Sequence, residues 1–160
     1  VFAYLYLYGI NPEVWSAPPP LSETAMIVGI EAAALLAAWG GRRVLASKEG
    51  RLAEDLPWML EALAATLLVG ALYLDVTGWL ATGLEPTANG MGATVFMLSV
   101  LQGQVVVVAV IMATYLAFRE ARGIMTTPTN VTMDIVARFI MFCALQGMVF
   151  TFLPRVFPGV

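Results

Sequence analysis

The chain contains no histidine, one cysteine and few charged residues. Eight basic and eleven acidic residues make up 12% of its 160 residues, and the net charge is −3. Because histidine is the commonest ligand for haem, copper and catalytic zinc, its absence argues against a redox metal held by this chain. The single Cys143 excludes an intrachain disulfide or thiolate cluster, and we interpret it as a small buried hydrophobe. Without a basic stripe, we expect no nucleic-acid partner.

Apolar residues are abundant instead. They account for 60% of the sequence, and the mean hydropathy is +0.84. Soluble domains average about 45–50% apolar and about 25% charged residues. The excess of apolar surface needs to be buried against something larger than the protein's own core, so the composition predicts an integral membrane protein.

Apolar windows of about 20 residues predict an all-α, polytopic membrane helix bundle that forms one domain over 1–160. The five predicted spans are 1–10, 24–41, 57–83, 91–118 and 134–157. The first would cover only about 15 Å as a helix, so we interpret it as the outer end of an incomplete span. We do not predict a signal peptide there, because no charged segment precedes it. A glycine pair is predicted to end the second span, and Pro57 to open the third.

The basic residues predict the orientation. The connections 42–56 and 119–133 hold Arg42, Arg43, Lys48, Arg51, Arg119 and Arg122, whereas 11–23 and 84–90 hold none. Cytoplasmic loops carry the excess of lysine and arginine, so we predict that the C-terminus lies on the outer side. Arg155 opposes this pattern, and we expect it to lie among lipid headgroups.

Two glutamines interrupt the long apolar run "LSVLQGQVVVVAVIMATYLAF" at 98–118. An amide in hydrocarbon needs hydrogen-bond partners. Gln102 and Gln146 are each followed by glycine, which permits close helix approach, so we predict interhelical contacts between the fourth and fifth spans. Gln104 lies about 200° around the helix from Gln102, so the two cannot share one small site. The functional alternative is a lipid-headgroup site or a water chain.

Four ionisable residues lie inside the predicted spans, namely Glu31, Glu61, Asp75 and Arg138. Such residues are functional candidates by default. The three acids, at different depths, could contribute to a proton path. The interpretation we favour is pairing within the bundle or with a partner subunit, and Arg138 is a candidate partner of Glu61. The sequence offers no nucleophile–base pair, phosphate loop or metal-ligand spacing.

The fourth and fifth spans resemble a known family. The segments "LEPTANGMGATVFMLSVLQGQVVVVAVIMATYLAFREARG" and "MDIVARFIMFCALQGMVFTFLPRVFP" are similar to the last two helices of subunit III of haem–copper oxidases, particularly bacterial versions fused to or encoded with subunit I. The family's aromatic–Gly–Ala/Ser–Thr helix start corresponds to 91–94, and its His/Gln–Gly–x–His core to 102–105. The front of the chain resembles the end of the family's third helix and its proline-rich outer loop. The resemblance therefore covers helices three to seven.

The chain also departs from the family pattern. Val105 stands where the family usually has a histidine, and the family's histidines in the last helix are absent. The family's first two helices, which form a lipid-holding cleft, have no counterpart in this sequence.

The resemblance implies an accessory subunit that is not catalytic alone. It implies a subunit that binds no cofactor, packs on oxidase subunit I in a complex with subunit II, holds phospholipids and supports proton uptake. Haem and copper would belong to those partners, and the bacterial inner membrane is favoured over the mitochondrial one. Gln102, Gln104 and Gln146 would then be polar packing or lipid contacts. Two alternatives stay open: a small transporter or channel module, motivated by the acids within the spans, and a structural subunit of another respiratory or photosynthetic complex.

Overall fold

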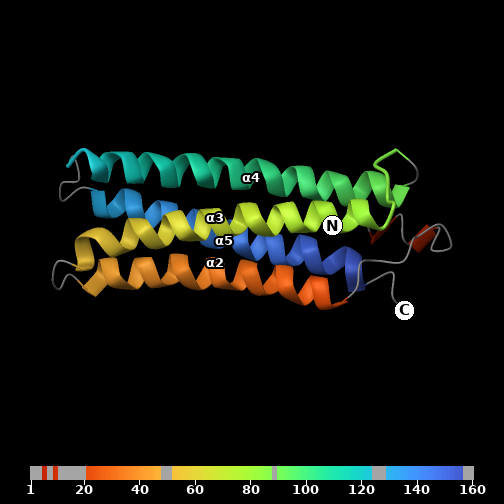
Figure 1. The fold of residues 1–160 in the computed structure, drawn as a ribbon, viewed down its shortest axis with the longest axis horizontal. Helices are drawn as coiled ribbons and strands as arrows, with labels where there is room; N and C mark the ends of the chain where they lie inside the picture. Colours follow the sequence, from red (N-terminus) through yellow and green to blue (C-terminus); the bar gives the residue numbers. More distant parts are fainter. Residues whose placement is uncertain are drawn as a thin grey trace.

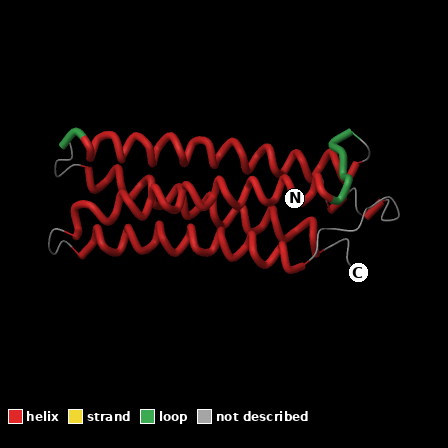
Figure 2. Tube along the Cα trace, viewed as in Figure 1, coloured by secondary structure: helices red, strands yellow, loops and turns green. Residues whose placement is uncertain are grey.

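Four long helices dominate the structure. The computed structural model describes residues 5–6, 9–10, 21–47, 52–87, 90–123 and 129–156, with the backbone alone for 21–22, 47, 52–55 and 129–130. The helices are α2 (Leu21–Ser47), α3 (Leu52–Ala81), α4 (Gly90–Ala121) and α5 (Thr129–Val156). They lie side by side along their length (Figure 1), and the described chain is otherwise made of short helical pieces and turns (Figure 2).

Each of the four helices is long and apolar enough to cross a membrane. The apolar stretches run over 24 to 32 residues, which exceeds the roughly 20 that the hydrocarbon core requires. Within the described residues the structure thus indicates a helical membrane bundle with four spans, one fewer than the five predicted. Of the remaining predicted span, 1–10, only 5–6 and 9–10 are described, as helical, and the rest lies outside the described residues.

The boundary between the first two of these spans also differs from the prediction. Helix α2 continues through Gly41 to Ser47, and α3 begins at Leu52, before Pro57. A Cβ atom at Gly41 would lie 3.1 Å from the carbonyl oxygen of Pro57 and 3.4 Å from Cβ of Leu60. The glycine therefore serves the close approach of α2 to α3 rather than ending a helix.

The helices alternate in direction. Helices α2 and α4 each pack against α3 and α5, and α3 also contacts α5, so α2 and α4 lie on opposite sides of the bundle (Figure 1). We call the end where α2 and α4 terminate the basic end, and the other the far end. Arginines stack on aromatic rings towards the basic end, where the pairs are Arg43–Trp39, Arg119–Tyr115 and Arg122–Phe118, with 4.5–5.6 Å to the ring centroids. Aromatic and basic side chains of this kind are typical of a membrane interface.

The bundle has small residues inside and large apolar residues outside. Fully buried alanines line its centre, among them Ala34, Ala38, Ala64, Ala109 and Ala144. Large apolar side chains such as Leu36, Tyr73 and Ile111 are more than 60% exposed. In a water-soluble bundle the large apolar side chains lie inside and polar side chains outside. Small residues inside and large apolar residues outside are what close helix packing within lipid favours.

The core divides into two apolar clusters. The main apolar cluster occupies the middle and the basic half, and it includes Ala34, Leu68, Val106, Ala109 and Ile140. The far-end cluster consists of Trp79, Leu84, Met91, Val95 and Leu98. Polar side chains are buried where the two clusters meet.

Candidate functional site

Six buried polar side chains, contributed by all four helices, form what we call the polar cluster. Its members are Glu31 of α2, Asp75 of α3, Ser99 and Gln102 of α4, and Thr151 and Arg155 of α5, each at most 9% exposed. Helical spacing explains the arrangement. Ser99 and Gln102 are three residues apart, and Thr151 and Arg155 four apart, so each pair shares one helix face. The cluster lies nearer to the far end of the bundle.

An ion pair between α3 and α5 organises the cluster. Nη1 of Arg155 lies 2.5 Å from Oδ1 of Asp75 and donates a second hydrogen bond, 3.0 Å long, to the carbonyl oxygen of Thr151. The guanidinium also lies over the ring of Trp79, 4.9 Å from its centroid. Our expectation that Arg155 lies among headgroups was wrong. The carboxylate of Asp75 and the ring of Trp79 lie at the same depth inside the bundle. They compensate the free-energy cost of burying the guanidinium.

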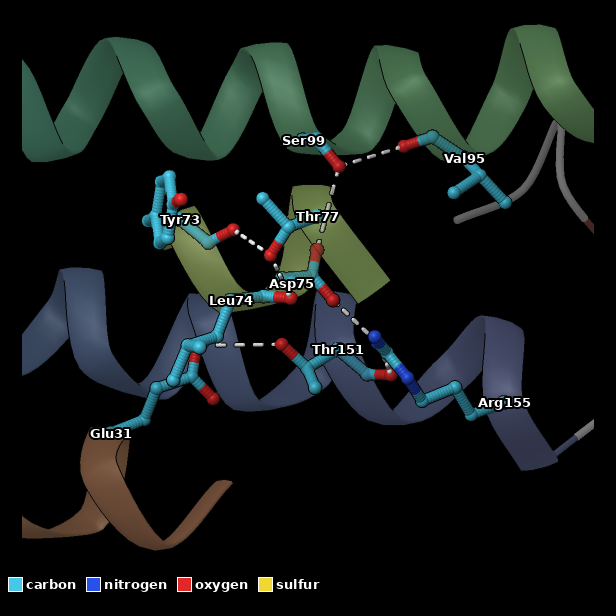
Figure 3. A network of polar contacts seen from close by, with 9 residues as sticks. All are labelled: Glu31, Tyr73, Leu74, Asp75, Thr77, Val95, Ser99, Thr151 and Arg155. Carbon is cyan, nitrogen blue, oxygen red and sulfur yellow. Dashed lines mark hydrogen bonds and ion pairs between the residues drawn. The ribbon is translucent and has the colours of Figure 1, made fainter. Parts of the chain in front are cut away.

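The second oxygen of Asp75 and the carboxylate of Glu31 are held by hydroxyl groups. Ser99 Oγ lies 3.5 Å from Oδ2 of Asp75 and 3.2 Å from the carbonyl oxygen of Val95, so its single proton can go to either acceptor (Figure 3). Thr151 Oγ1 donates to Oε1 of Glu31 at 3.4 Å. Both distances to carboxylate oxygens are long for a hydroxyl hydrogen bond, which is usually 2.5–3.0 Å. The hydroxyl groups therefore hold Glu31 and Oδ2 of Asp75 only loosely, whereas Oδ1 of Asp75 is bound closely by Arg155.

Gln102 connects α4 to α5, as the sequence predicted, but not through Gln146. Its Nε2 donates a 2.9 Å hydrogen bond to the carbonyl oxygen of Cys143. Gln146 is partly exposed and makes no hydrogen bond with another described side chain, so within the described residues Gln102 makes the predicted interhelical contact and Gln146 does not. Gln104 is exposed on the outside of α4.

A small cavity lies within the polar cluster. Its volume is about 10 Å³, and its lining includes Glu31, Asp75, Ser99, Gln102 and Thr151. This is the space that a single water molecule needs. Two lining residues each have an oxygen atom without a hydrogen-bond partner in the described part of the chain, namely Oε2 of Glu31 and Oε1 of Gln102. In the same cluster, Nε and Nη2 of Arg155 also lack a partner there.

Gly147 makes room for this arrangement. A Cβ atom there would collide with Oε1 of Glu31 and lie 2.8 Å from Nε2 of Gln102. The "LQG" repeat at 145–147 thus supplies the glycine, rather than the glutamine, to the site.

Glu61 and Arg138 do not belong to the polar cluster. Glu61 lies 14 positions before Asp75 on α3, about 21 Å along the axis at 1.5 Å per residue. It is 1% exposed, and neither of its carboxylate oxygens has a hydrogen-bond partner in the described chain. Arg138 binds Asp134 instead, with Nε 2.8 Å from Oδ2, and Arg42 of α2 contacts the same carboxylate. The proposed Glu61–Arg138 pair was wrong because Asp134 stands one turn before Arg138 on α5 and offers it a nearer partner.

The chemistry available to the polar cluster is ionic. It contains two carboxylates and one guanidinium, with three uncharged oxygen-bearing side chains around them. Within the described residues, no group of three or more His, Cys, Asp or Glu side chains could hold a metal ion. Sequence analysis identified Glu31, Asp75 and Gln102 but missed Ser99, Thr151 and Arg155. The four-residue spacing of Gly147, Thr151 and Arg155 was the signal that could have found the last two.

Comparison of the chain with known protein families, with curated proteins and with solved structures gave no match.

Proposed function

We propose that this protein is an accessory, subunit III-like component of a respiratory haem–copper terminal oxidase. In this proposal it packs beside the catalytic subunit I in the membrane, holds lipids along its apolar faces and supports proton uptake during turnover. The haem and copper belong to the partner subunits, and the chain is not catalytic alone.

The outward-facing Gln104 is the observation that carries this proposal. It lies 14 residues from the start of α4 and 17 from its end, so it is near the middle of the span. Large apolar side chains surround it on the exposed face, among them Val100, Leu101, Val107 and Val108. Gln104 makes no hydrogen bond with another described residue. An amide without a hydrogen-bond partner costs free energy at this depth in lipid. We therefore infer that Gln104 hydrogen-bonds to a polar group on a neighbouring membrane subunit.

The oxidase assignment is supported by the sequence resemblance, which centres on this same helix. The segment 102–105 corresponds to the family's polar core, and its two glutamines face different ways: Gln102 is buried towards α5 and Gln104 is exposed. One helix thus joins the bundle internally and offers a polar group to a partner. With the basic end in the cytoplasm, the C-terminus lies on the outer side of a bacterial inner membrane.

A transport function has weaker support. A path across the membrane would need polar groups or water at successive depths. Between Glu61 and the polar cluster, the interior is filled by the main apolar cluster, with Ala34, Leu68 and Ala109 fully or almost fully buried.

The test is co-purification in mild detergent through a tag on this chain, followed by an absorption spectrum and mass spectrometry. The proposal expects a haem-bearing subunit I with copper. We expect Gln104→Leu to lower the yield of the partner severalfold, because it removes the outward amide, whereas Val107→Leu on the same face should retain the partner. Recovery of this chain alone, colourless and monodisperse, would contradict the proposal. Chlorophyll in the preparation would assign the chain to a different complex.

A further inference from the structure

We propose that the polar cluster binds one monovalent cation the size of a sodium ion, in the cavity between Glu31, Asp75 and Gln102. This inference is independent of the oxidase assignment, because it rests on the interior of the four-helix bundle and not on any partner. It assigns the buried acids a ligand-binding role rather than a place in a path across the membrane.

The orientation of two buried acceptor atoms supports the site. The Cys143 carbonyl can only accept a hydrogen bond, so the atom of Gln102 that contacts it is the amide nitrogen. The amide oxygen of Gln102 is therefore turned away from Cys143, and the cavity lining includes this residue. Glu31 of α2 lines the same cavity, and its Oε2, like Oε1 of Gln102, lacks a partner in the described chain. Gln102 is 5% exposed and Glu31 is 3% exposed. Two buried, unsatisfied acceptors around one small space call for a positively charged or donating occupant.

Further oxygen atoms complete the coordination. Asp75, Ser99 and Thr151 belong to the same lining, and their side chains carry further oxygen atoms. The hydroxyl contacts to the two carboxylates, at 3.5 and 3.4 Å, are loose enough for these oxygens to turn towards a central ion. Carboxylate, amide and hydroxyl oxygens are the ligands that hard cations prefer.

Charge and size limit the choice of cation. When both carboxylates are ionised, Glu31 and Asp75 face the single guanidinium of Arg155, which leaves one negative charge uncompensated inside the bundle. A monovalent ion neutralises this charge, whereas a divalent ion would reverse it. The cavity, about 10 Å³, has room for one occupant of the size of a water molecule, and so for an ion only after it has lost its water shell. No group of three or more acids comes together in the described chain, which further disfavours calcium, since calcium takes six to eight oxygen ligands.

An exposed acidic side chain lies near Arg155, between α2 and α3. A surface groove there is lined by Glu23, Thr77 and Gly78. A Cβ atom at Gly78 would lie 3.5 Å from Oε2 of Glu23 and 3.8 Å from Nη2 of Arg155. The exposed carboxylate of Glu23 thus comes close to the buried guanidinium across a residue without a side chain.

The experiment measures thermal unfolding of the purified protein in detergent, with NaCl replaced by choline chloride at constant ionic strength. A ligand that binds the folded state at ten times its Kd raises the melting temperature of a chain this size by about 3–6 °C. We expect sodium to produce such a rise and choline none. Equilibrium dialysis with radioactive ²²Na⁺ should then give one ion per chain.

Matched variants locate the effect. Glu31→Gln preserves the shape of the side chain but removes its charge, and it should abolish both the sodium-dependent rise and the bound ²²Na⁺. Glu61→Gln removes a buried carboxylate outside the cluster, and it should leave both unchanged. Ser99→Ala, which alters no charge, should weaken sodium binding severalfold and provides the test if Glu31→Gln does not fold. Equal stability of the unmodified protein in sodium and choline would overturn the proposal, as would a sodium response that survives Glu31→Gln.

Discussion

The contribution of a charged residue to the stability of this bundle depends on its burial and on whether it has an ion-pair partner. Arg155 and Asp75 are both buried and paired, whereas Arg138 and Asp134 pair at the surface. A charge inside an apolar environment is tolerated only with a compensating partner. Removing the partner therefore lowers the free energy of unfolding. Exposed pairs are solvated and contribute little.

The Asp75–Arg155 pair gives the prediction at this scale. We expect Arg155→Gln to lower the free energy of unfolding in detergent by about 3 kcal/mol, because it leaves the buried carboxylate of Asp75 without a cation. Asp75→Asn should destabilise through the uncompensated guanidinium. The double variant should lose less than the two single losses added together, since neither charge is then isolated. Arg138→Gln, which removes an arginine whose side chain is 62% exposed, is the control and should cost less than about 1 kcal/mol.

Chemical or thermal unfolding of all four variants under one condition provides the measurement. Strict additivity of the two single changes would show that the residues do not act as a pair, and it would contradict the geometry described here.

At the scale of the helices, small residues set how closely two elements approach. Gly40 and Gly41 are adjacent on α2 and differ in their surroundings. A Cβ at Gly41 meets the backbone oxygen of Pro57 at 3.1 Å, whereas one at Gly40 meets only Cδ1 of Leu60 at 3.8 Å. The first contact involves backbone that cannot rotate away, and the second is ordinary packing.

This difference predicts opposite outcomes for neighbouring substitutions. We expect Gly41→Ala to lower the free energy of unfolding by about 1–2 kcal/mol, because α3 has to shift away from α2. Gly40→Ala should be neutral or slightly stabilising, since alanine favours the helix over glycine by about 1 kcal/mol. Thermal melts of the two variants in the same detergent compare them directly. A loss of the same size at both positions would mean that the tight contact at Gly41 does not set the α2–α3 distance.

The same glycines show how far sequence reasoning reaches. Hydropathy predicted the four complete spans, because each helix must carry about 20 apolar residues whatever its neighbours are. It placed the end of the second span at the glycine pair, because a glycine that permits close packing and one that terminates a helix look alike in a sequence. Only the position of Pro57 on the facing helix distinguishes the two roles here.

The site was predictable to a similar extent. Acids and glutamines inside spans are conspicuous, so Glu31, Asp75 and Gln102 were found as candidates. Their convergence was not predicted, because a single sequence does not show which faces of four helices pack against one another. Arg155 was misplaced for the same reason. Its position near the end of α5 is compatible with headgroups, and the deciding facts are the carboxylate of Asp75 and the ring of Trp79 at the same level.

The whole molecule is organised as alternating layers along its axis. The far-end cluster comes first, then the polar cluster, then the main apolar cluster, and Glu61 lies towards the basic end. Small residues allow the helices to pack closely in the main apolar cluster, and Ala34, Ala64 and Ala109 are fully buried there. Ions cross such a region only where polar groups or water line a path.

We therefore expect liposomes that contain this chain alone to show no proton or sodium flux above that of protein-free liposomes, although sodium stabilises the purified protein. A pH-sensitive dye inside the vesicles, with a potassium gradient and valinomycin to set the membrane potential, measures the proton flux. Release of trapped ²²Na⁺ measures the sodium flux. Flux that disappears in both Glu61→Gln and Glu31→Gln would contradict this expectation, because it would require the two buried acids to communicate through the main apolar cluster. Binding without flux is the result that the layered interior predicts, since the polar cluster is closed off from Glu61 by packed alanine and leucine side chains.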